Sequence, residues 1–207
     1  MCLFCSTGSK GDAETVPAYM TKIKFQQVEP QLPKNSFESQ PKIIYRAGTA
    51  YSRTEEAVDQ TTHTHRLAVI NEPNAWLIDL ISKTGEHIVD SSPPFRVHMP
   101  VFTLDPQRYN EIDKLEYANE VKFFLEKGAT RTKANLMGTP THKYDLTVDK
   151  IFHVTLWTSL ATKKPLQIRC ADGQNSQTIR YLTYDTNLKF SPDLFAPPKG
   201  VTFTESH

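Results

Sequence analysis

Residues 150–160, KIFHVTLWTSL, carry the clearest strand signal in the chain, because apolar and polar side chains alternate along them with a period of two. Phe152, Val154 and Leu156 fall on one face and the intervening residues on the other, as in a half-buried β-strand. The alternation restarts in PLQIRC after a short turn, and again in SQTIRYLTYDTNLKF after Asp172-Gly173. Three strands in series joined by short loops predict an antiparallel meander.

Residues 191–203, SPDLFAPPKGVTF, close this meander. Pro192 and the pair Pro197-Pro198 cannot donate backbone hydrogen bonds to a ladder, so the strand pattern stops here. Leu194 and Phe195 lie between these prolines, and we expect them to fold back onto the sheet as an apolar plug.

Shorter segments bounded by turn residues extend the sheet upstream of the meander. The runs LAVI, residues 67–70, and WLIDLI, residues 76–81, are almost wholly apolar, which predicts burial on both faces of the sheet. The segments predicted as strands are 19–28, 42–46, 50–55, 66–71, 75–80, 86–90, 134–137 and 144–148.

The middle of the chain predicts helix within residues 105–127. Asp105-Pro106 is typical of a helix start, Asp113 with Glu116 resembles a capping box, and Gly128 stands where a C-cap belongs. Apolar residues at spacings of three and four form a stripe that packs on the sheet as core, covers a cavity as a lid, or does both. The stripe consists of Leu115, Ala118, Val121, Phe124 and Leu125.

Length and composition favour one β-rich globular domain. The chain has 207 residues, 38% of them hydrophobic, with 14 prolines and 8 glycines. Residues 1–17 lack periodicity and are predicted to be a flexible tail, which leaves residues 18–207 as the domain. The 24 Lys and Arg nearly balance the 23 Asp and Glu, so no overall field recruits nucleic acid or an anionic membrane. No segment reaches the roughly 18 consecutive apolar residues of a membrane-spanning helix.

The last strand is rich in tyrosine and is followed by an apolar pair and PPKGV, residues 197–201. These residues resemble the C-terminal signature of the lipoprotein-carrier superfamily, which includes carriers of outer-membrane lipoproteins. NEPNAWLIDL, residues 71–80, resembles a strand pair of the superfamily in which a short polar turn precedes an aromatic residue, here Trp76. KLEYANEVKFF, residues 114–124, resembles related members in the segment where the superfamily has its lid. The resemblance implies an incomplete antiparallel β-barrel, closed by short helices, that shelters acyl chains in an apolar cavity.

We therefore expect a mainly β protein with some α, a single antiparallel open half-barrel closed by a short helical lid. The resemblance implies non-enzymatic binding or carriage of a hydrophobic, lipid or acylated ligand, with no cofactor or metal and with a lipoprotein or membrane-anchored protein as a further partner. It also implies a periplasmic or cell-envelope location; residues 1–10 are too short and polar for a complete signal peptide, which leaves a cytoplasmic location as the alternative. The positions expected to line the cavity are Phe25, Trp76, Ile78, Leu115, Val121, Phe124, Leu125, Val154, Leu156 and Tyr181.

Two other functional classes stay open from the sequence. His63 and His65 share a face of an extended chain, and with Glu55 across a hairpin they predict a zinc site of a metal-dependent hydrolase. Adjacent threonines and the lack of a carboxylate at fixed spacing favour a solvated pair instead. A filled β-domain that binds another protein through a sheet edge is the remaining alternative. Catalytic signatures such as G-x-S-x-G, phosphate loops and H-E-x-x-H are absent from the sequence.

Overall fold

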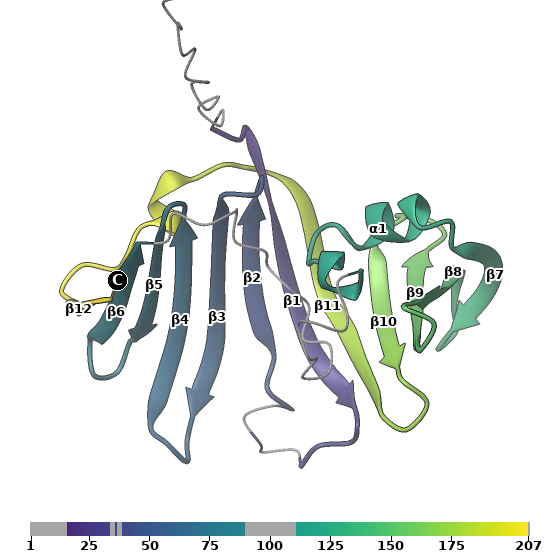
Figure 1. Ribbon diagram of the computed structural model, residues 1–207, viewed down its shortest axis with the longest axis horizontal. Helices are drawn as coiled ribbons and strands as arrows, with labels where there is room; N and C mark the ends of the chain where they lie inside the picture. Colours follow the sequence, from purple (N-terminus) through teal and green to yellow (C-terminus); the bar gives the residue numbers. More distant parts are fainter. Residues whose placement is uncertain (1–15, 34–35, 37–38, 90–110, 207) are drawn as a thin grey trace, which may run out of the picture.

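The computed structural model describes residues 16–33, 36, 39–89 and 111–206. Within these residues the chain forms one twelve-stranded sheet with short helices beside it (Figure 1). The helices are η2 (Ile112–Lys114), α1 (Glu120–Glu126) and η3 (Pro192–Phe195). The strands are β1 (Tyr19–Glu29), β2 (Lys42–Ala47), β3 (Tyr51–Asp59), β4 (Thr64–Asn71), β5 (Asn74–Asp79), β6 (Thr84–Val89), β7 (Thr130–Leu136), β8 (Thr139–Val148), β9 (Phe152–Ser159), β10 (Pro165–Ala171), β11 (Ser176–Lys189) and β12 (Thr202–Ser206).

The strands follow one another in the order β12-β6-β5-β4-β3-β2-β1-β11-β10-β9-β8-β7. Neighbouring strands are antiparallel except β12 and β6, which run parallel. The two outermost strands, β12 and β7, do not meet, so the sheet stays open (Figure 1). The expected class, a mainly β protein built on one open and mostly antiparallel sheet, is confirmed, and this sheet is not closed into a barrel.

The meander predicted from the sequence forms β9, β10 and β11. Val154 of β9 pairs with Cys170 of β10, and Ile168 of β10 pairs with Ile179 of β11. The alternation seen in the sequence sets this register, because it turns Val154 and Leu156 to the buried face. At 14 residues, β11 is long enough to pair with β1 as well, which joins the meander to the upstream strands.

The two faces of the sheet are covered by different segments. The helix face, which carries Ile23, Ile44 and Leu156, packs against residues 112–124 in the main core. The tail face is the opposite one. It is covered by the segment that follows β11, in which Phe195 packs with Met20, and Phe203 packs against the cluster of Leu67, Val69 and Ile78.

The expected plug is confirmed on the tail face. Phe195 is completely buried, and Leu194 packs against its cluster. Pro192 lies at the start of η3, where its missing N–H costs no hydrogen bond. After η3 the chain continues into β12, which the sequence did not predict. Gly85 permits this pairing, because a Cβ there would lie 2.7 Å from the carbonyl oxygen of Leu77 and 3.0 Å from the Phe203 ring.

The helix is shorter than predicted. Residues 105–110 lie outside the described part of the chain, and α1 begins only after Asn119, whose side chain makes no capping hydrogen bond. The predicted capping box is wrong because Ala118 has φ +69°, in the left-handed region, and Glu116 pairs with Arg46 instead. The helix does end near Gly128, at φ +70°, as expected.

Two predicted burial patterns are also wrong. Leu77 of β5 is 50% exposed, so the WLIDLI run is not buried on both faces. Leu125 of α1 is 59% exposed, because the buried side of the helix carries Glu120, Phe123 and Phe124. The predicted tail, residues 1–17, falls almost wholly outside the described residues, and the division into tail and domain stays a prediction.

Candidate ligand-binding groove

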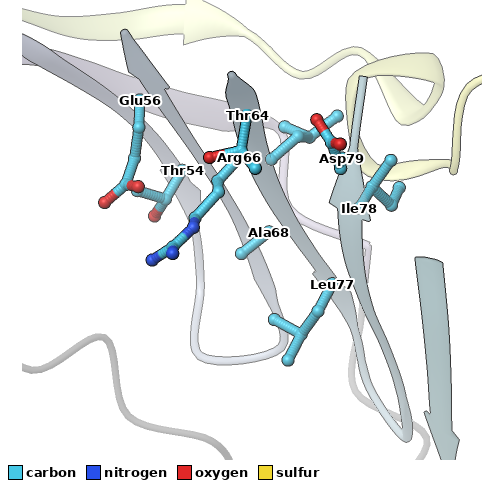
Figure 2. A pocket seen from close by; sticks show the side chains of 9 residues that line it. Thr54, Glu56, Thr64, Arg66, Ala68, Leu77, Ile78 and Asp79 are labelled. Atoms are coloured by element: carbon cyan, nitrogen blue, oxygen red, sulfur yellow. The ribbon is translucent and has the colours of Figure 1, made fainter. Parts of the chain in front are cut away.

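The helix face of the sheet has a filled part and a hollow part. Over β1, β2 and β8–β11 it forms the main core under residues 112–124. Across β3, β4 and β5 it carries a groove of about 470 Å³ (Figure 2). A volume of this size lies within the range of roughly 300–1,000 Å³ that is typical of small-molecule sites.

The register of three antiparallel strands builds the floor of this groove. Thr54 of β3 pairs with Ala68 of β4, and Ala68 pairs with Leu77 of β5, which sets the three side chains in one row. Residues directly opposite each other in an antiparallel ladder share a face. Arg66 and Asp79 form the next row. The lining residues are Thr54, Glu56, Thr64, Arg66, Leu67, Ala68, Leu77, Ile78 and Asp79.

The apolar part of the floor is centred on Ala68 and Leu77. Ala68 has the smallest side chain of the lining residues, and this leaves room above β4 between Thr54 and Leu77. Leu77 extends into the groove, whereas Ile78 points to the other side of β5 (Figure 2). A half-exposed leucine on a surface needs no explanation by itself. Inside a groove of this volume, it offers apolar area that a ligand can cover.

Asp79 is a structural group at one end of the groove. Its carboxylate accepts backbone hydrogen bonds from His65 at 2.9 Å, Ile81 at 3.1 Å and Ser82 at 3.3 Å. These bonds, led by the one from His65, lower the pKa of Asp79 to about 2. The carboxylate is therefore charged at neutral pH, and it holds the turn between β5 and β6 against β4.

Glu56 and Arg66 supply the polar groups that are available to a ligand. Both side chains extend to the same side of the sheet, from β3 and β4 respectively (Figure 2). The Oε2 atom of Glu56 is buried, and it has no hydrogen-bond partner within the described chain. A buried acceptor without a partner is unusual and favours a ligand that donates a hydrogen bond.

A buried ion pair fixes the segment that covers the filled part of the face. The guanidinium of Arg46 on β2 forms an ion pair with Glu116, and both residues are buried. Arg46 also donates from Nη1 to the carbonyl oxygen of Tyr117 at 2.7 Å, and from Nε to that of Gly48 at 3.2 Å. The ion pair and the Nη1 hydrogen bond hold residues 116 and 117 against the sheet ahead of α1.

Glu120 provides a second buried polar anchor at the start of α1. It is fully buried and accepts hydrogen bonds from the hydroxyls of Tyr181 at 2.9 Å and Tyr184 at 2.8 Å. Burial raises the pKa of Glu120, although both hydrogen bonds act in the opposite direction. The folded protein therefore binds a proton at Glu120 at pH values where the unfolded chain has lost it.

This proton contributes to the pH dependence of stability, and Glu120→Gln will remove that contribution. With the folded pKa raised, the wild type loses stability as pH rises from the unfolded value of 4.5 through the folded pKa. Glutamine stays neutral and still accepts from one tyrosine. We expect the variant to gain stability relative to the wild type over that interval, measured by urea unfolding at a series of pH values. A difference that does not change with pH would contradict the proposed titration.

Most of the sequence-predicted site residues lie in the filled part of the helix face and not in the groove. Ile78 lines the groove, although its side chain packs on the tail face with Leu67 and Val69, and Trp76 packs beside that cluster. Leu125 is exposed on α1. The predicted site residues that belong to the main core are Phe25, Leu115, Phe124, Val154, Leu156 and Tyr181, and Val121 packs against it.

The histidine pair does not form a metal centre in the described chain. His65 Nε2 lies 3.8 Å from a Glu55 oxygen, and His63 occupies the turn before β4 with φ +52°. Across the described ranges, no three His, Cys, Asp or Glu side chains are grouped so that they hold a metal ion. The geometry gives the hydrolase alternative no support.

Sequence reasoning did not select Thr54, Ala68 and Leu77. The pairing of the strands could have identified these three residues. Thr54 pairs with Ile44, Ala68 with Thr54, and Leu77 with Ala68, so all three lie on the same face of the sheet as the buried Ile44. These residues can be recognised only when the register across β2–β5 is known. The prediction from apolar character alone favoured larger residues.

Comparison with known proteins supports the architecture. No family model and no curated protein matches the chain. An uncharacterised conserved protein from Thermus thermophilus is similar at TM-score 0.51 and 10% identity, over 91% of each chain, which shows a shared fold. A LolA superfamily protein from Nitrosomonas europaea matches at TM-score 0.37 and 11% identity, over 88% of this chain and 91% of that one. A putative outer membrane lipoprotein-sorting protein domain from Vibrio parahaemolyticus matches at 0.36 and 10%, over 86% and 88%.

No helix in the described residues is long and apolar enough to cross a membrane.

Proposed function

We propose that this protein binds a hydrophobic or acylated ligand, without catalysis, in the groove across β3, β4 and β5. The observation that carries the proposal is the groove itself, a hollow of about 470 Å³ on the helix face with Ala68 and Leu77 in its floor. The resemblance of residues 178–201 to lipid carriers supports the same ligand class. It also supports a periplasmic or cell-envelope location and a lipoprotein or membrane-anchored partner.

The residues assign different parts of the ligand to different parts of the groove. An apolar chain lying along Ala68 and Leu77 loses contact with water, at about 25 cal/mol per Å² of buried apolar surface. A polar head near Glu56 and Arg66 keeps its hydrogen bonds, and a donor on it satisfies the Oε2 atom of Glu56. An amphiphile meets both requirements.

The predicted positions in the main core take part only after a movement. Leu115, Phe124 and Leu156 are completely buried, so a ligand reaches them only when residues 112–124 leave the sheet. We therefore propose that the ligand first binds in the groove. In a second step α1 acts as a lid, when residues 112–124 move away from the sheet and the ligand reaches the core.

Leu77→Ser will test the apolar floor. We expect the affinity for a fluorescent fatty acyl probe to fall about three- to tenfold, because part of the probe loses its apolar contact. Stability will change little, since Leu77 is already 50% exposed. The matched control is Leu182→Ser on β11, which is 41% exposed and lies outside the groove. The measurement is a probe titration paired with a urea midpoint for each variant.

Filling the groove gives a second and independent test. Ala68→Trp places a large ring over the floor and will reduce probe binding at least about tenfold. Ala161→Trp, in the exposed turn after β9, makes the same chemical change elsewhere and will leave binding intact. Probe affinity equal to wild type in both Ala68→Trp and Leu77→Ser would overturn the proposal.

A further inference from the structure

Basic side chains gather at the β7 edge of the sheet, far along the strand order from the groove. Lys133 of β7 pairs with His142 of β8, and Arg131 pairs with Tyr144, so all four side chains share one face. The turn after β9 lies beside them, because the Leu160 N–H donates to the carbonyl oxygen of Pro140 at 3.1 Å. This turn contributes Lys163.

The charges in this cluster act on one another. Desolvation lowers the pKa of His142, and the positive charges of Lys163, Arg131 and Lys133 lower it further. The three cationic side chains are exposed. Among the residues that the structure describes, none of the three forms an ion pair with a carboxylate. We call Arg131, Lys133, His142 and Lys163 the basic edge.

Nearby acidic groups are already engaged. Asp145 lies 2.9 Å from Lys143 and accepts a hydrogen bond from Thr155 at 2.9 Å. Asp185 lies 3.9 Å from Lys164. The positive potential of the basic edge is therefore local, in a chain whose formal net charge is only +1.

An apolar side chain projects from the turn that joins β7 and β8, the two strands that carry Arg131, Lys133 and His142. Met137 is 75% exposed at the tip of the β7–β8 hairpin, more than the other exposed large apolar residues of the described chain. Met137 and Gly138 have φ +51° and +86°, as in a tight two-residue hairpin turn. The Gly138 N–H donates to Asn135 Oδ1 at 2.7 Å, which further fixes the turn. The methionine is thus held out into solvent.

From this arrangement we infer that the basic edge and Met137 form a docking surface for an anionic phospholipid membrane. Exposed cations attract lipid phosphates, and one flexible apolar side chain at a protruding turn enters the interface between headgroups and acyl chains. An acidic polypeptide would satisfy the charges but would leave Met137 in water. The inference does not depend on the groove, because none of its residues lines that site.

Vesicle flotation with the full chain will test this surface. The probes are vesicles of phosphatidylcholine containing phosphatidylglycerol, and vesicles of phosphatidylcholine alone. We expect binding only to the anionic vesicles, and we expect it to weaken at high salt because exposed charges are screened. Arg131→Gln combined with Lys133→Gln will weaken binding about ten- to thirtyfold, and Met137→Ser about threefold. Urea midpoints will show that each variant is folded.

The control removes the same number of positive charges near the opposite edge of the sheet. Lys83 and Lys199 are exposed residues near β6 and β12, and Lys83→Gln combined with Lys199→Gln will change binding less than about twofold. An equal loss in this control would overturn the inference. It would also be overturned by equal binding to both kinds of vesicle, or by binding to polyglutamate without binding to anionic vesicles.

Discussion

Phe195→Ala will lower the free energy of unfolding by about 3–5 kcal/mol, measured as a lower urea midpoint. Phe195 is completely buried, and its ring centroid lies 5.5 Å from that of Tyr51 and 5.4 Å from that of Phe190. Alanine removes these contacts and leaves a cavity between the sheet and the segment that covers the tail face. That segment also leads into β12, so its loosening will reach the far edge of the sheet.

An exposed aromatic residue supplies the control for this substitution. Tyr19 on β1 is 63% exposed, and Tyr19→Ala will change stability by less than about 0.5 kcal/mol. An unchanged midpoint for Phe195→Ala would show that residues 191–203 contribute nothing to the tail face in solution.

Arg46→Leu will cost about 3–5 kcal/mol, because it leaves the buried Glu116 carboxylate without a counter-charge. The Tyr117 carbonyl oxygen loses its 2.7 Å donor in the same variant. Adding Glu116→Leu removes the unpaired charge, so the double variant will recover at least about half of the loss. The measurement is a double-mutant cycle based on urea unfolding.

An exposed ion pair on the same segment serves as the control. Lys122 lies 3.8 Å from Glu126, with side chains 70% and 63% exposed, and Lys122→Leu will change stability by less than about 1 kcal/mol. If the losses of Arg46→Leu and Glu116→Leu simply add, then the two side chains do not act as a pair, and the described anchor is wrong.

The strands were predictable because their signal is local. Alternation with a period of two defines both the strand and the face that it buries, and in β9–β11 it also determined the register. The parallel strand β12 was missed because its partner β6 is distant in sequence. Their close contact also requires a residue without a side chain at position 85, where Gly85 lies beside Phe203. That is a property of the pair of strands and not of either one.

The helix and the site depended on partners that the sequence does not place side by side. Glu116 has the spacing of a capping residue, but it forms an ion pair with the buried Arg46 of β2. The helix therefore starts later, at Glu120. Large apolar residues were expected to line a cavity. The structure instead fills the core with Leu115, Phe124 and Leu156 and leaves the hollow over Ala68. A small residue such as Ala68 leaves room for a groove, and the sequence reveals this only when the register across several strands is known.

Photo-crosslinking of the wild-type protein with a photoreactive fatty acid, followed by mass spectrometry of the peptides, tests the groove most directly. We expect labelling of β3, β4 and β5, centred on Thr54, Ala68 and Leu77, and loss of that labelling when unlabelled fatty acid competes. Labelling confined to other strands, or labelling that excess fatty acid does not reduce, would contradict it.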